Sequence, residues 1–252
     1  AWTGPFGSVD FLPSLLQALE NEGANYAAIA VAPGFGYALP VGPGTTIGLE
    51  IKDVILARTD LPISRLKLSN VQMGRYDARI SFQLDESTQI EIPRQWASVD
   101  VKIRGISFRL ITTHLESLDP PMYPVNVRYY QAQELLAGPA ATELPVVIVG
   151  DINSEPGDLG DAAQLLIEAG FVDSWQTAFP GQTGYTCCHP ADLSNPTSTM
   201  VEQIDLILTR GDFSVAAIDT LGDEPQSFAI LGKWPSDHAG VVATLIVPMH
   251  PD

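Results

Sequence analysis

The sequence predicts an α/β (α+β) fold in which two mainly antiparallel sheets pack face to face and helices cover the outside. Three observations predict it: strand-like segments dominate, helical segments are interspersed among them, and two alternating segments meet at Arg104-Gly105 as in a tight hairpin. The chain has 252 residues, 45% of them apolar, and its composition nowhere changes sharply. We therefore expect a single domain over residues 1–252.

The first element expected is a helix over residues 8–23. Its apolar residues, among them Leu12, Leu15 and Leu19, are spaced along one helical face, and Gly23 supplies a stop. Apolar or alternating segments then predict strands over 25–32, 47–58, 77–84, 96–105 and 106–117, the last two forming the hairpin.

The second half of the chain continues the same alternation of elements. A helix is expected over 126–139, where Gly138-Pro139 ends it, and a strand follows over 146–150. A helix over 161–171 comes next. After a long polar stretch, strands are expected over 202–210 and 238–248.

The charge balance is strongly acidic, with 13 basic and 30 acidic residues and a net charge of −17. Tight binding of duplex DNA requires a basic surface, so the composition disfavours that class of partner. It favours a secreted or extracellular protein, or one whose partner is a small molecule. No apolar segment reaches the roughly 18 residues of a membrane span, so no transmembrane segment is expected. Cys187 and Cys188 are adjacent, have no zinc-type spacing, and leave the redox compartment open.

Polar residues recur at or near the ends of four expected strands. Any one of them alone is typical of a turn or a capped strand end. Asp205 is harder to explain in that way, because an acid between Ile204 and Leu206 is costly to bury without a partner. Together they indicate one shared site, and they are His114, Asp151, Asn153, Asp205, Asp237 and His238.

The residue types of this set point to phosphoester chemistry. Carboxylates and an amide oxygen suit Mg²⁺, Mn²⁺ or Ca²⁺ better than zinc. Two histidines beside carboxylates supply a general base and a group that stabilises developing charge. Attack of water on a phosphodiester or phosphomonoester needs this combination. A serine hydrolase fits less well, since the sequence has no G-x-S-x-G turn.

Four motifs, "TTHLES", "IVGDINSEP", "QIDLILTR" and "PSDHAGVV", resemble in order and separation those of the endonuclease/exonuclease/phosphatase superfamily. They span residues from about 110 to 247, and weaker similarity extends back to about residue 50. The resemblance implies a DNase I-like, four-layer sandwich with its active site at one edge of the two sheets. It also implies a metal-dependent phosphoric ester hydrolase.

The motifs also imply a role for each residue that matches them. Asp151 and Asn153 would hold the attacking water and a phosphate oxygen. Asp237 would bind the metal ion, Mg²⁺ or else Mn²⁺ or Ca²⁺, together with Asp151. His238, paired with Asp205, would be the acid/base residue.

Two further residues match family positions that contact the phosphoryl group. His114 matches the histidine of the T-H-L motif and would stabilise the phosphoryl oxygens. Arg94 precedes a central strand and matches a phosphate-binding arginine more loosely. The substrate expected is a small phosphoester or a lipid headgroup rather than duplex DNA.

The sequence also departs from the family pattern. The family's first strands carry an asparagine and a Gln-Glu pair whose glutamate is a metal ligand, and the sequence begins after that region. We therefore expect the domain to be incomplete at its N-terminus. The alternative is a non-catalytic binding module that kept the sandwich but lacks the metal-binding glutamate.

Overall fold

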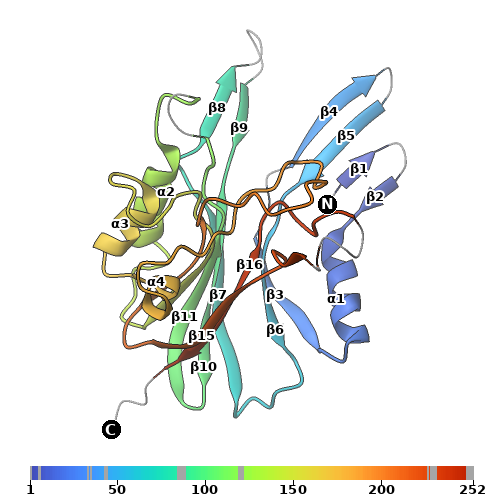
Figure 1. Cartoon of the computed structure of the whole chain (residues 1–252). Coiled ribbons are helices and arrows are strands. Elements are labelled where there is room, and N and C mark those ends of the chain that lie inside the picture. Colours follow the sequence, from blue (N-terminus) through green and yellow to red (C-terminus); the bar gives the residue numbers. More distant parts are fainter. Residues whose placement is uncertain are drawn as a thin grey trace.

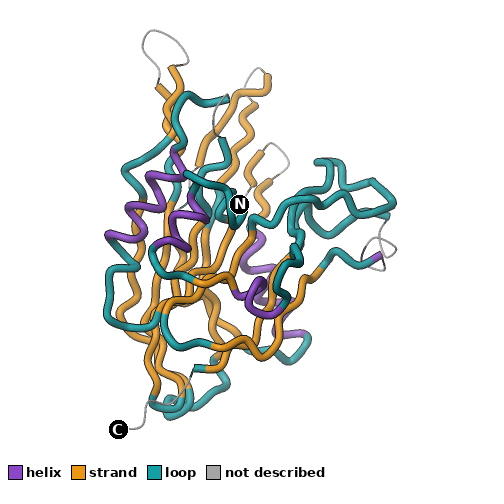
Figure 2. Tube along the Cα trace, turned by 60° about the vertical axis from the view of Figure 1, so that its left-hand side comes forward, coloured by secondary structure: helices purple, strands orange, loops and turns teal. Residues whose placement is uncertain are grey.

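The computed structural model describes residues 2–4, 7–32, 34, 36–42, 45–83, 89–118, 122–225, 227 and 232–247. Strands far outnumber helices in the described part of the chain, and loops connect them (Figure 2). No described helix combines the length and the apolar character that crossing a membrane requires.

The largest sheet has six strands in the order β13-β14-β12-β11-β10-β7. All neighbours in it are antiparallel except β11 and β12, which run parallel. Its strands are β7 (Leu66–Arg75), β10 (Gln95–Ile103), β11 (Ile106–Thr113), β12 (Val146–Asp151), β13 (Val172–Asp173) and β14 (Asp205–Arg210).

Two antiparallel strand pairs face this sheet: β3 (Tyr26–Ala32) with β6 (Asp53–Arg58), and β15 (Ser214–Leu221) with β16 (Gly240–Ile246). Apolar residues of β3 and β6, such as Ala30 and Ile55, pack against Val99 of β10. This burial of apolar side chains between the two strand layers holds them together.

Helices cover the two outer faces (Figure 1). On one side α1 (Phe11–Asn21) lies against β3, and on the other lie α2 (Val127–Ala137), α3 (Ala162–Glu168) and α4 (Ser174–Ala178). The four-layer, DNase I-like sandwich expected from the sequence is therefore confirmed.

The remaining strands form two smaller sheets outside the sandwich. One has the order β2-β1-β5-β4, with β1 (Trp2–Gly4), β2 (Gly7–Val9), β4 (Gly36–Gly42) and β5 (Thr45–Glu50). The other pairs β8 (Ile80–Gln83) with β9 (Gln89–Ile92). Figure 1 shows the β4–β5 and β8–β9 hairpins extending from the same end of the molecule.

The expected helices are confirmed with shorter bounds, because capping side chains fix where each begins. Asp10 caps α1 by accepting a hydrogen bond from the Leu12 backbone N–H, and Asn126 and Asp161 cap α2 and α3. The hairpin is also confirmed: Arg104 and Gly105 have φ of 52° and 94°, as a two-residue turn with positive φ requires.

One expected strand is wrong, and others were missed. Residues 47–58 form two strands, since β5 ends at Glu50 and pairs with β1 and β4, whereas β6 pairs with β3. Edge strand β7 was missed because its residues are mostly exposed and show no clean alternation. Strand β8 covers 80–83 of the expected 77–84, and residues 84 and 248, at the ends of two expected strands, lie outside the described residues.

Candidate active site

The strand topology brings polar side chains from four strands to one edge of the large sheet. Arg94 precedes β10 and His114 follows β11, and these strands are antiparallel. Because β12 runs parallel to β11, Asp151 at its end reaches the same edge. Asp205 begins the antiparallel β14 directly opposite Asp151. The same edge therefore collects one cation, one imidazole and two carboxylates.

Gly150 allows the close approach of β11 and β12 at this edge. Its φ is 143°, and a Cβ atom there would lie 1.9 Å from the backbone oxygen of Thr113. Any side chain at this position would therefore separate the two strands that carry His114 and Asp151.

His238 comes from the facing strand layer, two residues before β16. Its Nδ1 lies 2.7 Å from Oδ2 of Asp205, within hydrogen-bond distance. This hydrogen bond with the carboxylate raises the pKa of His238 above its ordinary value. The backbone on either side is also fixed, since Ala239 N–H donates to Thr186 and the Asp237 carbonyl accepts from His189. Asp205 thus holds one ring nitrogen and leaves Nε2 for chemistry.

Asp151, Asp205 and His238 each place a ligand atom within 4.8 Å of those of the other two. Burial raises the pKa of Asp151 to about 6, and the neighbouring charge of Asp205 adds to the effect. Two carboxylates this close repel each other when both are ionised. A divalent cation would relieve this repulsion, and two carboxylates with one imidazole are a donor set that fits Mg²⁺ or Mn²⁺.

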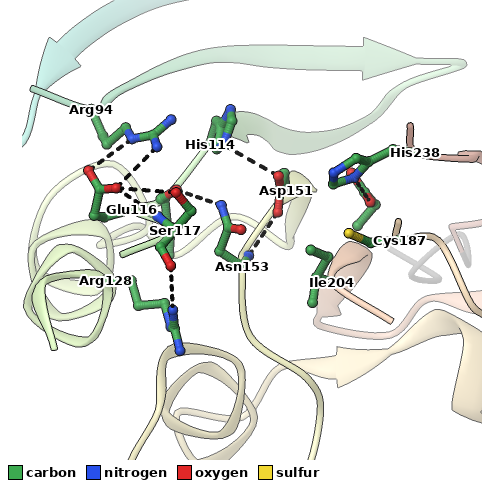
Figure 3. A network of polar contacts seen from close by, with 12 residues as sticks. Arg94, His114, Glu116, Ser117, Arg128, Asp151, Asn153, Cys187, Ile204 and His238 are labelled. Carbon is green, nitrogen blue, oxygen red and sulfur yellow. Dashed lines mark hydrogen bonds and ion pairs between the residues drawn. The ribbon is translucent and has the colours of Figure 1, made fainter. Parts of the chain in front are cut away.

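His114 and His238 lie on opposite sides of Asp151, and Nε2 of His114 is 3.3 Å from Asp151 Oδ2 (Figure 3). Burial lowers the pKa of His114 to about 4, and the positive charge of Arg94 contributes. His114 is therefore neutral at pH 7. At this pH its contact with Asp151 joins an uncharged imidazole to a carboxylate and is not an ion pair.

In an extended chain Asp151 and Asn153 would point to the same face, but in the structure Asn153 follows Asp151 through a turn. Its φ is 53°, and its backbone N–H donates to Oδ1 of Asp151 at 2.9 Å. The aspartate accepts the N–H two residues later, which closes a local turn that asparagine tolerates well. The Asn153 side chain donates to the Leu115 carbonyl, and Ile152 is buried in the core.

Glu116 belongs to the surroundings of the site and was missed in the sequence. It is 1% exposed, and it accepts two hydrogen bonds of 3.2 Å from the Arg94 guanidinium (Figure 3). It also accepts the backbone N–H groups of Ser117 and Leu118. An acid two residues after His114, at the end of an apolar strand, is the signal that would have identified it.

Asp237 differs from the other predicted site residues. It is exposed, and its carboxylate accepts a hydrogen bond of 3.2 Å from Ser236 Oγ. Among the described residues, two groups of side chains place three ligand atoms close enough together to hold a metal ion, and neither includes Asp237. The metal-binding role of Asp237 stays a prediction.

Asp53, at the start of β6, is a further partly buried acid, and the positive charge of Arg94 acts on it. Its Oδ2 has no hydrogen-bond partner among the residues the structure describes, and burial raises the pKa of Asp53 to about 6. Because this pKa is higher in the folded state, Asp53 stabilises the fold when protonated. That stabilisation is lost as the pH rises from about 4 to about 6.

We therefore expect the Asp53→Asn variant to gain stability relative to the wild type across this pH interval. The gain should be on the order of 2–3 kcal/mol, and urea unfolding at a series of pH values measures it. Asp158→Asn, the same change at an exposed position, is the control and should leave the pH dependence unchanged. Parallel stability curves for Asp53→Asn and the wild type would contradict the prediction.

Comparison with known proteins identifies the family. The Endonuclease/Exonuclease/phosphatase family matches residues 34–238, so the chain belongs to this family, whose members are hydrolases that act on phosphoesters. The resemblance found in the four motifs is thereby confirmed. A comparison with curated protein sequences gives no match.

Solved structures of low sequence identity share the fold. A mannosyl-6-phosphatase from Bacteroides thetaiotaomicron is 17% identical with a TM-score of 0.54, and the match covers 93% of this chain and 90% of that one. TDP2 from D. rerio, complexed with single-strand DNA product, is 20% identical with a TM-score of 0.53 and coverages of 93% and 82%. A family protein from Leptotrichia buccalis is 13% identical with a TM-score of 0.58 and coverages of 96% and 80%.

Proposed function

We propose that this protein is a metal-dependent phosphoesterase that uses an activated water to hydrolyse a phosphomonoester or phosphodiester. The observation that carries the proposal is the Asp205–His238 pair, whose ligand atoms lie within 4.8 Å of one of Asp151. An oriented imidazole next to a carboxylate is the arrangement that general acid–base catalysis requires.

In the proposed reaction each residue acts through the contacts already described. His238 keeps Nδ1–H on Asp205 and exchanges a proton at Nε2 with water or with the leaving group. Asp151 orients the water, and the Asp151–Asn153 turn fixes the direction of both side chains. The neutral His114 donates a hydrogen bond to a phosphoryl oxygen. A divalent cation, held by Asp151 and Asp205 with Asp237 nearby, would neutralise phosphate charge.

The charge distribution supports a small substrate or a lipid headgroup. The net charge is −17, and Arg94, which acts electrostatically on both His114 and Asp151, is already paired with Glu116. A long nucleic acid would approach an acidic surface against repulsion. An extracellular location, which the acidic composition favours, is part of the same proposal.

A hydrolysis panel tests the proposal. The protein is assayed with bis-p-nitrophenyl phosphate, p-nitrophenyl phosphate, sphingomyelin and plasmid DNA, each with Mg²⁺, Mn²⁺, Ca²⁺ or a chelator. We expect metal-dependent turnover of a small ester or of the lipid, little cleavage of plasmid, and loss of turnover in His238→Gln. If no substrate is hydrolysed above the rate of His238→Gln, the protein is a binding module and the proposal fails.

A further inference from the structure

Besides its carboxylate neighbours, His238 has two sulfur neighbours. Cys187 and Cys188 lie in the loop between α4 and β14, and their sulfur atoms and a ring nitrogen of His238 all lie within 4.8 Å of one another. Figure 3 shows Cys187 near His238 at the right of the site. His238 therefore belongs to two clusters of possible metal ligands, one with Asp151 and Asp205 and the other with Cys187 and Cys188.

The backbone holds the cysteine segment in this position. Cys187 forms isolated β-bridges with Glu202 on one side and with His238 on the other. Its carbonyl accepts N–H groups from Val201 and Glu202 at 2.7 and 3.0 Å. Backbone contacts therefore hold the cysteine segment beside His238, so the closeness of the cysteines to the histidine does not depend on one side-chain rotamer.

Sγ of Cys188 lies near Nε2 of His238, the ring nitrogen that the proposed reaction uses. Nδ1 of His238 is bound to Asp205, whereas Nε2 lies 3.8 Å from Sγ of Cys188. A ligand held by the cysteines and Nε2 would therefore occupy the lone pair with which His238 takes up a proton.

In the structure the two cysteines are joined in a disulfide. Cys187 is 1% exposed, whereas Cys188 is exposed and open to a dithiol reagent. A reagent thiolate attacks Sγ of Cys188, breaks the S–S bond and releases Cys187 as a thiolate. The second reagent thiol then displaces Cys188 and closes a cyclic disulfide. Two electrons and two protons pass from the reagent to the protein.

We propose that the reduced Cys187 and Cys188, together with Nε2 of His238, form an inhibitory site for a soft divalent cation such as Zn²⁺ or Cd²⁺. The two thiols release their protons to solvent, two metal–sulfur bonds and one metal–nitrogen bond form, and His238 is withdrawn from hydrolysis. The inhibition rests on the proposed function, whereas the metal site can be tested without it.

The donor set matches what soft cations select. Two thiolates and an imidazole bind zinc with a fourth position left to water. Mg²⁺ instead prefers oxygen donors such as the carboxylates of Asp151 and Asp205. Asp205 would have the further role of orienting the ligand, because a carboxylate on the second ring nitrogen fixes the imidazole tautomer and strengthens binding.

The binding test uses Cd²⁺ alone as the probe and the ultraviolet thiolate-to-cadmium charge-transfer band as the readout. We expect the reduced wild type to saturate at one equivalent and the oxidised wild type to show no band. Affinity should fall at least about tenfold in Cys188→Ser and in His238→Gln, each reduced in the same way. Circular dichroism checks that each variant is folded.

The inhibition test measures ester hydrolysis in excess Mg²⁺ with and without one equivalent of Cd²⁺. We expect Cd²⁺ to lower the hydrolysis rate of the reduced wild type at least about tenfold. The hydrolysis rates of the oxidised wild type and of reduced Cys188→Ser should not change when Cd²⁺ is added. No charge-transfer band in the reduced wild type, or equal affinity in His238→Gln, would overturn the site. A band without inhibition of measurable hydrolysis would overturn the inhibitory role. If no form hydrolyses any ester, the proposed function fails, and the band still decides the metal site.

Discussion

The Asp151→Asn variant is expected to lose about a hundredfold or more of its metal-dependent hydrolysis while keeping its fold. The substitution removes the charge that orients water and helps to hold a cation, and losses of this size follow when such a group is deleted. It removes no core contact, since Asp151 lies at the end of β12 and its side chain faces the site. Asparagine can still accept the Asn153 N–H through its carbonyl oxygen.

Steady-state kinetics with Mg²⁺ or Mn²⁺ measure this loss, and circular dichroism confirms the fold. Asp219→Asn, the same chemical change at an exposed position on β15, is the matched control and should keep full activity. Near wild-type turnover by Asp151→Asn would mean that the aspartate serves only the turn.

The Ile152→Asp variant is expected to unfold. Ile152 is 0% exposed and belongs to the apolar cluster that also contains Leu115, Ile148 and Leu206. A carboxylate there would be buried without a partner, at a cost of several kcal/mol, against a total stability of about 5–15 kcal/mol for a typical protein.

Thermal unfolding followed by circular dichroism measures the effect. The matched control is Ile152→Val, which removes one methylene group and should cost only about 0.5–1.5 kcal/mol. A cooperative transition of Ile152→Asp close to that of the wild type would show that the residue can turn out of the core.

The sequence predicted well those features that depend on neighbours in the chain. The apolar segment ending at Gly150 predicted β12, and the turn at Arg104 and Gly105 predicted the hairpin whose two outer ends carry Arg94 and His114. Polar residues at the ends of apolar strands then indicated which side chains share a site. All of these patterns are local.

What could not be predicted depends on partners far away in the chain. The burial of Glu116 requires the Arg94 guanidinium, which comes from the segment just before β10. The break between β5 and β6 reflects their different partner strands, which no alternation of residues 47–58 reveals. The turn at Asn153 follows from an aspartate that accepts a backbone N–H, a choice that competes with continued extension.

The position of His238 in the chain has a consequence for the order in which the site forms during synthesis. Arg94, His114, Asp151 and Asp205 all leave the ribosome before it, and the imidazole that Asp205 orients comes only with the last strand pair. A nascent chain can therefore form much of the large sheet without an acid–base pair. In the proposed reaction, acid–base catalysis by His238 would therefore begin only after β16 has joined the fold.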